Sequence, residues 1–481
     1  MKVSISYPPI ESDKGVPLLS QNRQFQYFNE PTYIYPMIPA YAATLLYEND
    51  YEVTWDDGIA EHLTYEEYLE RLDKSRPDLI AIETKTPTIK TYWKYINEFK
   101  ERWPDSKVVL MGDHVTAFPQ ESLENSFVDY VLTGGDYDFQ LLSLVNHIGK
   151  GKPLTPGFWW RESDGSIRAN GHFVQNNDVS KLPFINRDLT KWWLYTKNGN
   201  FKYEPGTYTM VGRDCWWRNG GGCTFCSWTT LYKKFQVRPP ESLLDEIEML
   251  HEKYGIREIF DDTGTFPAGS WLKTFAQGMI DRGLASKVRI GCNMRFGVLK
   301  EDDYKLMGRA GFRFILYGLE SANQKTLNHL QKGTTNEEAW QACKWAKKYG
   351  MNPHLTIMMG YPWETYEDAK KTIEFTKKIF NAGFVETLQA TIVIPYPGTV
   401  LYDQCKKNGW LITEDYDRYD MREAVMKSEL TGEQVKELTQ DLYKVFLSPR
   451  YIVRKALSIR TKDDIVFAMR GVKYIYGHLK D

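Results

Sequence analysis

The chain has 481 residues, 42% hydrophobic and 26% charged, and its formal net charge is -2; at about 150 residues per domain this length predicts roughly three folding units and excludes a single small module. The net charge is near neutral and the sequence has neither a basic stripe nor an acidic tail, so nucleic acid is not an expected partner. No apolar run approaches the ~18 residues of a membrane span, and the start of the chain lacks a secretory signal, which indicates a soluble cytoplasmic protein with no transmembrane segment.

Residues 1–150 alternate between strand-like and helical segments. The expected strands span residues 2–6, 51–55, 78–82, 107–111 and 129–132. The expected helices span residues 36–48, 65–74, 88–101, 119–125 and 137–148. This alternation predicts an α/β domain with a doubly wound, Rossmann-like parallel sheet over residues 1–150.

Ligands on a doubly wound sheet bind outside the carboxyl ends of its strands, so the loops there are the candidate binding segments. They hold neither a GxGxxG nor a Walker loop, and a nucleotide is therefore not favoured. For one residue among them, His114, contact with a ligand and a simple hydrogen bond within the loop are equally good interpretations. The candidate residues in these loops are Tyr7, Pro8, Pro9, Thr84, Lys85, Gly112, Asp113, His114, Thr116, Gly134, Gly135 and Asp136.

Residues 151–204 are expected to form a connector, and residues 205–410 contain a second alternation, of six strand and helix units. Six such units predict a partial (β/α)6 TIM barrel whose chemistry lies at the carboxyl ends of its strands. The expected strands span residues 207–211, 257–260, 288–292, 313–318, 354–359 and 386–394. Polar or glycine-containing segments follow the second to fifth of these strands. Residues 411–481 are expected to form a small helical region that helps to shape a substrate pocket.

Three of the six cysteines, Cys215, Cys223 and Cys226, are close together in a glycine-containing loop after the first of these strands. The remaining three are scattered, and a disulfide framework is improbable in a large cytoplasmic chain. Structural zinc normally takes four protein ligands, and no fourth cysteine or histidine is found at a suitable spacing. Three thiolates instead suit a 4Fe-4S cluster that leaves one iron open for another ligand.

The cysteine loop, together with the segments that follow the later strands, resembles the core of a radical S-adenosylmethionine (SAM) enzyme over about residues 205–410. The family's usual motif has three residues between the first two cysteines, whereas this chain has seven. The resemblance implies that Cys215, Cys223 and Cys226 hold the cluster and that SAM chelates its open iron. It implies SAM contacts from Phe225, Asp261, Asp262, Asn293, Arg295, Glu320, Gly360 and Tyr361.

With this core downstream, the loops of the first domain resemble the cobalamin-binding domain of the cobalamin-dependent radical SAM class. The resemblance implies that the cobalamin tail extends into the sheet and that the corrin faces the barrel. The Asp-x-His-x-x-Gly motif that supplies a cobalt ligand is absent, because Asp113 and His114 are adjacent. Cobalamin is therefore expected in a histidine-off form.

The function that the resemblance implies is methylation of an unactivated carbon, with the cluster cleaving SAM to a 5'-deoxyadenosyl radical and methylcobalamin supplying the methyl group. A cyclase or rearrangement enzyme with the same domains is the alternative, because fold does not settle reaction. A non-catalytic cobalamin or iron-sulfur binding protein is a remote alternative. The implied partners are an electron donor such as a flavodoxin or ferredoxin and a substrate that is a small molecule, a lipid or a protein side chain. No catalytic residue beyond the cluster ligands is assignable.

Overall fold

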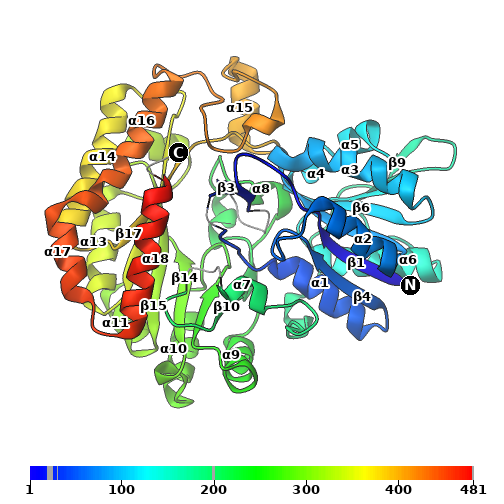
Figure 1. Ribbon diagram of the computed structural model, residues 1–481. Helices are drawn as coiled ribbons and strands as arrows, with labels where there is room; N and C mark the ends of the chain where they lie inside the picture. Colours follow the sequence, from blue (N-terminus) through cyan, green and yellow to red (C-terminus); the bar gives the residue numbers. More distant parts are fainter. Residues whose placement is uncertain (19–24, 30, 198–200, 479–481) are drawn as a thin grey trace.

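The computed structural model describes residues 1–18, 25–29, 31–197 and 201–478, and it contains two sheets that lie side by side (Figure 1). The first sheet has the strand order β4-β1-β5-β6-β7-β8-β9. Its strands are β1 (Lys2–Tyr7), β4 (Glu52–Asp57), β5 (Leu79–Thr84), β6 (Lys107–Gly112), β7 (Tyr130–Leu132), β8 (Phe158–Arg161) and β9 (Ile167–Ala169). The first five in this order pair in parallel, and β8 and β9 join antiparallel at one edge. The order reverses between β1 and β5, which is where a doubly wound sheet binds ligands.

The second sheet is parallel throughout and follows chain order, β10-β13-β14-β15-β16-β17. Its strands are β10 (Gly206–Thr209), β13 (Glu258–Asp261), β14 (Arg289–Met294), β15 (Phe312–Glu320), β16 (Asn352–Met359) and β17 (Thr387–Ile392). Two short antiparallel pairs stand apart from the large sheets: β2 (Val16–Pro17) with β3 (Tyr27–Phe28), and β11 (Gly212–Arg213) with β12 (Gln236–Val237).

Helices connect and cover both sheets (Figure 1). Those that accompany the first sheet are α1 (Met37–Glu48), α2 (Tyr65–Ser75), α3 (Ile89–Arg102), α4 (Asp113–Ala117), α5 (Pro119–Asn125) and α6 (Tyr137–Lys150). After α7 (Trp193–Lys197) and α8 (Trp228–Leu231), the helices of the second sheet are α9 (Pro240–Tyr254), α10 (Ser270–Asp281), α11 (Glu301–Arg309), α12 (Gln324–His329), α13 (Asn336–Lys348), α14 (Tyr366–Asn381) and α15 (Val400–Asn408). The last three are α16 (Gly432–Tyr443), α17 (Pro449–Ser458) and α18 (Lys462–His478). Among the described residues, no helix combines the length and the apolar character that crossing a membrane requires.

Several helices begin where the sequence provides a capping box. Thr64, Thr335, Thr365 and Thr431 precede α2, α13, α14 and α16, and each side chain accepts a hydrogen bond from the backbone N–H three residues later. The acidic or amide side chain at that third position bonds back to the threonine backbone. Such reciprocal bonds satisfy two N–H groups that a helix start otherwise leaves without partners, which fixes where these helices begin.

The predicted α/β class with parallel sheets is confirmed, and the expected strands and helices recur near the predicted bounds. Two segments differ from the prediction. Residues 113–117, expected as a loop, form α4. The sheet also continues beyond residue 150, since β8 and β9 of the expected connector cover the edge of β7. Local patterning does not reveal such edge pairing, because the partner strand is distant in sequence.

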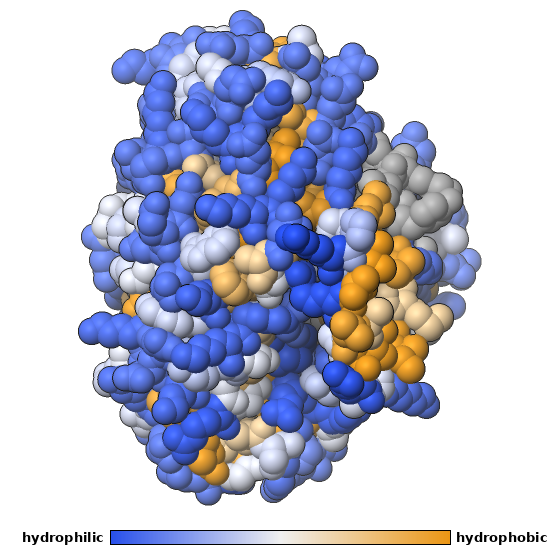
Figure 2. All heavy atoms as spheres, turned by 90° about the vertical axis from the view of Figure 1, so that its left-hand side faces the viewer, coloured by the Kyte–Doolittle hydropathy of each residue, from blue (hydrophilic) through white to orange (hydrophobic). Residues whose placement is uncertain are grey.

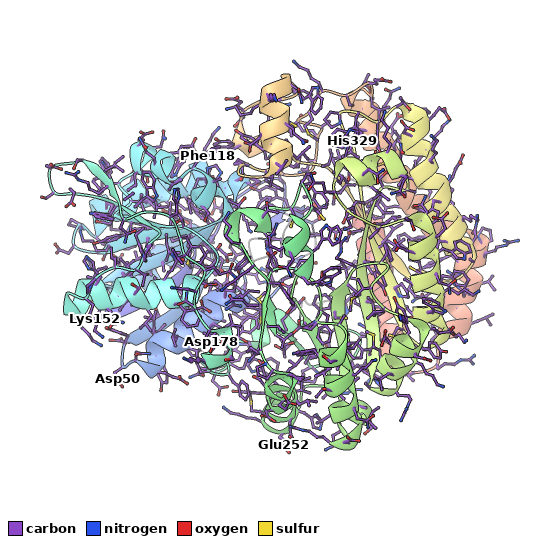
Figure 3. All side chains as sticks on the ribbon, turned by 180° about the vertical axis from the view of Figure 1, so that it is seen from behind. Asp50, Phe118, Lys152, Asp178, Glu252 and His329 are labelled. Carbon is purple, nitrogen blue, oxygen red and sulfur yellow. The ribbon has the colours of Figure 1, made fainter. Side chains whose placement is uncertain are left out.

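Buried ion pairs join the two halves of the molecule. The guanidinium of Arg213 on β11 donates to the carboxylate of Asp138 on α6 at 2.5 Å, and both side chains are buried. The same guanidinium lies 5.3 Å from the centre of the Tyr41 ring. Phe118, directly after α4, lies on the side of the first domain that faces α15 (Figure 3). Its ring packs edge-on against Tyr402 of α15, with the ring centres 5.9 Å apart. A charged contact and an apolar contact therefore hold the first sheet against the second.

The connector is anchored in a similar way. Glu246 of α9 is buried and accepts from two guanidinium groups, Arg187 at 3.1 Å and Arg238 at 2.6 Å. Arg187, in the connector, also donates to the backbone carbonyl of Tyr208 at 2.9 Å. The buried guanidinium of Arg187 thus fixes the connector to both β10 and α9.

Loss of the buried charge between the halves should destabilise the protein. Asp138→Asn removes the carboxylate that pairs directly with the buried Arg213 guanidinium and leaves only the Asp136 charge near it, so we expect a loss of about 3–5 kcal/mol in the free energy of unfolding, measured by urea titration. Glu367→Gln removes an exposed partner of Lys370, 3.7 Å away, and serves as the matched control. Its expected cost is below about 0.5 kcal/mol, because exposed pairs contribute little. Equal effects of the two variants would contradict the assignment of Arg213 and Asp138 as a structural link.

Candidate functional site

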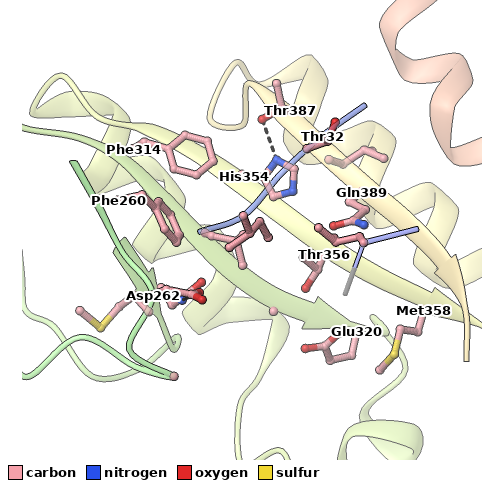
Figure 4. A pocket seen from close by; sticks show the side chains of 18 of the residues that line it. Thr32, Phe260, Asp262, Phe314, Glu320, His354, Thr356, Met358, Thr387 and Gln389 are labelled. Carbon is pink, nitrogen blue, oxygen red and sulfur yellow. Dashed lines mark hydrogen bonds between the residues drawn. The ribbon is translucent and has the colours of Figure 1, made fainter. Parts of the chain in front are cut away.

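A cavity of about 490 Å³ runs through the second sheet's concave side, from the carboxyl ends of the strands down to α18. Alternate residues of β13, β15 and β16 face it (Figure 4). Part of its wall comes from the N-terminal segment, through Leu18, Phe28, Thr32 and Ile34. Most of the lining is apolar, with a few polar groups that converge, as in a ligand-binding pocket.

The three clustered cysteines all line this cavity, and all three are partly exposed. The Cys215 thiol lies 2.8 Å from the Thr265 hydroxyl, and the loop between Cys215 and Cys223 turns through Gly221 and Gly222. These glycines have φ values of 97° and 79°, in the left-handed region that side chains disfavour. A further Cβ at Gly222 would also meet the guanidinium of Arg218. The glycines therefore allow the loop to fold back and bring its thiols to one wall.

The spacing of these thiols bears on the kind of metal they can hold. Within the part of the chain that the structure describes, no three His, Cys, Asp or Glu residues are grouped closely enough for a single metal ion. A tetrahedral zinc site needs sulfurs about 3.8 Å apart, given Zn–S bonds of about 2.3 Å. In an iron-sulfur cluster each thiolate binds a different iron, so the sulfurs are farther apart. Three partly exposed thiols that line one cavity are the donor set of a 4Fe-4S cluster with one open iron, whereas a closed structural zinc site needs a fourth ligand.

Two predicted acidic residues at the end of β13, Asp261 within the strand and Asp262 after it, have different environments. Asp262 lines the cavity and accepts from the Asn293 amide at 3.3 Å. Asp261 is fully buried on the other side of the strand, where its carboxylate accepts from the Thr209 hydroxyl at 2.9 Å and from the Val211 N–H at 3.0 Å. Burial raises its pKa. Asp261 therefore braces β10 against β13 and does not line the cavity, so the expected direct contact with SAM is not supported for this residue.

Glu320 at the end of β15 forms a buried ion pair with Lys332, with 2.8 Å between carboxylate and ammonium. Both residues line the cavity, and the backbone of Glu320 has a left-handed φ of 63°. A Cβ at Gly318 would lie 2.6 Å from the Lys332 ammonium and still closer to the Glu320 carboxylate. Glycine at position 318 therefore makes room for this pair. Lys332 was not predicted, because it follows α12 in a segment without a recognisable motif.

Arg295 lies beside the cysteine loop. Its guanidinium donates to the backbone carbonyl of Lys332 and approaches the Cys223 sulfur at 3.6 Å. It also covers the Trp217 ring, 4.4 Å from its centre. Stacking and a backbone bond hold the cation in place, so Arg295 can offer positive charge to an anionic group in the cavity. Trp217 is a second cavity residue that the sequence interpretation did not assign.

The other predicted SAM-binding residues divide between the cavity and its support. Phe225 lines the cavity, with the Lys332 ammonium 5.8 Å from its ring centre. Gly360 and Tyr361 do not line it. A Cβ at Gly360 would meet Val435 of α16 at 2.9 Å, and the Tyr361 ring packs against Trp363 at 5.6 Å. The buried Tyr361 hydroxyl has no hydrogen-bond partner among the described residues.

Deeper in the cavity, a polar group lies among apolar side chains. His354 of β16 is hydrogen-bonded through Nδ1 to the Thr387 hydroxyl at 2.8 Å, and Gln389 lies nearby (Figure 4). Burial lowers the pKa of His354 to about 4, so its imidazole is neutral near pH 7. At the far end, Arg313 donates to Glu258 at 2.9 Å. These residues were not predicted, because strand interiors provide no motif.

The predicted residues of the first sheet gather at the carboxyl edge of its strands, and none of them lines the large cavity. Several of them are hydrogen-bonded or paired with one another or with neighbouring residues. Tyr7 donates to Glu83 across the switch point, Lys85 pairs with Asp113 at 3.3 Å, and the Thr116 hydroxyl donates to the Gly112 carbonyl at 2.6 Å. Burial raises the pKa of Glu83 to about 7.

His114 is held by its protein neighbours. Its ring nitrogens lie 3.2 Å from the Thr86 hydroxyl and 3.0 Å from the Glu121 carboxylate. The Tyr416 ring packs edge-on against it, with the ring centres 4.8 Å apart. Both nitrogens therefore already have partners, as in a structural histidine.

Other polar atoms at this edge of the first sheet have no hydrogen-bond partner among the described residues. Within the described part of the chain, Glu83 Oε1 and Asp136 Oδ1 are buried without a hydrogen-bond partner, as are the hydroxyls of Ser227 and Thr230 on the facing segment after Cys226. The facing segment reaches the edge itself, since the Tyr232 hydroxyl donates to the Gly135 carbonyl at 3.1 Å. Buried polar atoms normally have partners, so a group of exceptions suits a ligand with many polar arms, such as cobalamin with its amides.

A thin layer of protein separates this edge from the cavity. Tyr396 lines the cavity, and its phenol lies near enough to Asp113 that the carboxylate charge, added to burial, raises the tyrosine pKa. The same hydroxyl donates to the Tyr419 carbonyl at 3.2 Å. The edge of the first sheet and the cavity are therefore neighbouring sites.

Comparison with known proteins agrees with this geometry. Residues 210–376 match the radical SAM superfamily model. The chain is 29% identical over 433 residues to the uncharacterized methyltransferase PH0819 of Pyrococcus horikoshii, covering 87% of this chain and 89% of that protein. It is 25% identical over 415 residues to an anaerobic magnesium-protoporphyrin IX monomethyl ester cyclase of Cereibacter sphaeroides, covering 83% of this chain and 64% of the cyclase.

The fold is similar to that of a solved structure of the radical SAM methyltransferase TsrM from Kitasatospora setae, which has cobalamin and a 4Fe-4S cluster bound. The TM-score is 0.69 at 15% identity, and the match covers 93% of this chain and 89% of that one. At this identity the likeness concerns the arrangement of the two sheets and their helices.

The clustered cysteines should control iron content. Cys215→Ala, Cys223→Ala and Cys226→Ala should each lose most of the iron and sulfide that the parent protein retains after anaerobic reconstitution. Cys343→Ala and Cys405→Ala are the matched controls, because burial raises the pKa of both thiols, to about 12 for Cys405, and keeps them protonated. Iron and sulfide analysis gives the readout, and full iron retention by Cys226→Ala would refute the cluster site.

Proposed function

We propose that this chain, which carries a radical SAM domain over residues 210–376, is a cobalamin-dependent radical SAM methyltransferase that acts on an unactivated carbon. The observation that carries the proposal is the shared cavity, where three thiols lie together with paired charges suited to a zwitterionic ligand. The neighbouring edge of the first sheet, with its buried polar atoms that lack partners, supports a second cofactor site.

In this proposal residues 1–150 form the cobalamin-binding domain and residues 151–204 the connector. Residues 205–410 form the catalytic domain, an open six-stranded barrel, since β10 and β17 end the sheet. Residues 411–481 form a helical region that completes the cavity. Tyr443 at the end of α16, Phe446 after that helix and Tyr451 of α17 line the cavity and support this last assignment.

The chain's own residues would hold SAM by its charged amino acid end. Asp262 supplies negative charge for the ammonium, while Arg295 supplies positive charge for the carboxylate, and both line the cavity beside the thiols. The Glu320 and Lys332 pair can hydrogen-bond the ribose, and Phe225 offers a face to the adenine. With the cluster bound, the site supplies the electron that cleaves SAM.

Cobalamin would be held at the edge of the first sheet, where it would supply the methyl group. The proposed contacts are those predicted from the sequence, from Tyr7 to Asp136, with Ser227 and Thr230 added from the facing segment. Both ring nitrogens of His114 already have protein partners, which supports the histidine-off form. Because Tyr396 and its neighbours lie between the sites, they shield the reacting groups from water.

The electron would come from a flavodoxin or ferredoxin, and this requirement, with thiols that must stay reduced, fits the cytoplasm. A cyclase or rearrangement reaction is the second candidate, because the relative in Cereibacter sphaeroides is named a cyclase.

Anaerobic incubation of the reconstituted protein with cobalamin, a reductant and SAM bearing a deuterated methyl group tests the proposal. Methyltransferase chemistry predicts that 5'-deoxyadenosine forms and that the labelled methyl appears on cobalamin, both followed by mass spectrometry. Formation of 5'-deoxyadenosine without labelled methylcobalamin would favour the cyclase reading. Absence of both products would refute the enzyme assignment.

The Glu320 and Lys332 pair gives a sharper test of the SAM site. Gly318→Ala introduces a methyl group into the space that the pair occupies, so we expect SAM to bind the cluster-loaded protein about tenfold more weakly, as measured by calorimetry. Gly432→Ala adds the same group where nothing lies within 4 Å, and its affinity should not change. Unchanged affinity in Gly318→Ala would exclude the pair from the SAM site.

A further inference from the structure

The last two helices expose an unusual amount of apolar surface. Of the seventeen large apolar side chains that are exposed in the described part of the chain, nine fall within residues 447–473. They are Leu447, Ile452, Val453, Leu457, Ile459, Ile465, Val466, Met469 and Val472. The exposed fraction reaches 70% for Met469 and 67% for Leu457. Figure 2 shows an apolar strip down this side of the molecule, bordered by hydrophilic side chains. Clustered apolar exposure of this kind marks a surface that is covered in function.

The charges around this strip indicate the kind of partner that would bind it. Residues 447–473 contain seven basic and two acidic residues. The basic residues are Arg450, Arg454, Lys455, Arg460, Lys462, Arg470 and Lys473. Both acids are neutralised within the protein, since Asp463 pairs with Arg257 at 3.0 Å and Asp464 pairs with Lys202. Two of the basic residues are paired as well, Lys455 with Glu386 at 3.3 Å and Arg470 with Glu204 at 2.6 Å, and the positive excess comes from the other basic residues. The chain as a whole has a net charge of -2, so this positive surface is local. A basic, apolar helical surface is complementary to anionic lipid headgroups and their acyl chains.

The strip is continuous with the cavity. Phe467, Ala468 and Gly471 of α18 line the cavity from its inner side. Val472 also lines it, yet its side chain is 68% exposed. The cavity therefore reaches the surface beside Val472, at the end of the apolar strip.

We propose that α17 and α18 dock this protein on the surface of an anionic lipid bilayer, and that the opening beside Val472 admits the apolar chain of an amphiphilic substrate. The helices lie on the membrane and do not cross it, which agrees with the absence of a spanning helix among the described residues. The substrate part of this inference rests on the proposed function, whereas the docking part does not.

Vesicle co-sedimentation of the full-length, cluster-loaded protein tests the docking. Vesicles of equal parts phosphatidylglycerol and phosphatidylcholine should bind the protein, and vesicles of phosphatidylcholine alone should bind it about tenfold more weakly. The double variant Leu457→Glu/Met469→Glu should lower binding to the anionic vesicles about tenfold. Phe127→Glu is the matched control, since Phe127 is also exposed but lies after α5, in the first domain, and its binding should equal that of the parent.

Other results would overturn the proposal. If neither kind of vesicle binds, and sedimentation equilibrium without lipid gives a dimer that Leu457→Glu/Met469→Glu dissociates, the strip is an interface between two copies. If neither vesicles nor a second copy binds, the docking inference is also wrong. A melting temperature equal to the parent's shows that the double variant is folded.

The two proposals fail separately in this design. Formation of 5'-deoxyadenosine, measured on the same preparation, reports on the proposed function and needs no lipid. Turnover without vesicle binding refutes docking alone, whereas vesicle binding without turnover refutes the enzyme function alone. With both intact, anionic vesicles doped with a prenyl or acyl amphiphile should raise 5'-deoxyadenosine formation in the parent and not in the double variant. No increase with any such amphiphile would refute the substrate class.

Discussion

Parallel pairing of the six strands from β10 to β17 is the constraint on which the candidate site depends. Parallel strands share one direction, so their carboxyl ends meet at one edge and the loops that follow them converge. The cysteine loop follows β10, Asp262 follows β13, Arg295 follows β14 and Glu320 ends β15. Residues more than a hundred positions apart therefore line one cavity. Any change in strand order would separate the thiols from the charges that accompany them.

Buried ion pairs are the second feature that determines the structure. Glu320 with Lys332 at the cavity and Asp138 with Arg213 between the sheets are both pairs removed from water. Burying one charged partner without the other is costly, so each member of a pair requires the other to be in place. This dependence makes the pairs poor sources of net stability but effective determinants of geometry. At the cavity, the pair keeps two charged groups beside the thiols in an otherwise apolar chamber.

The molecule presents two ligand-binding regions that are close but separate. Tyr396 lies between them. It lines the cavity, and the Asp113 charge on the other side contributes to raising its pKa. On the far side of the chamber, α18 forms the remaining wall and carries the apolar strip on its outer face. In the proposed arrangement one cavity thus borders the methyl source on one side and a lipid surface on the other. The chemistry is then protected from water along its whole path.

The sequence by itself determined the alternation of strands and helices, the parallel pairing of the second sheet and of the first five strands of the first sheet, and the group of three cysteines. These depend on local periodicity and spacing, which a single sequence records directly. The tertiary structure decided which of two adjacent residues faces the cavity. Asp261 and Asp262 are neighbours at a strand end, but successive side chains point to opposite sides, so one braces β10 and the other lines the cavity. It also decided the place of Lys332 and of α18, because a partner distant in sequence leaves no local pattern. Contacts between distant segments arise only when the chain is packed, and they determine which polar side chains lie in the site.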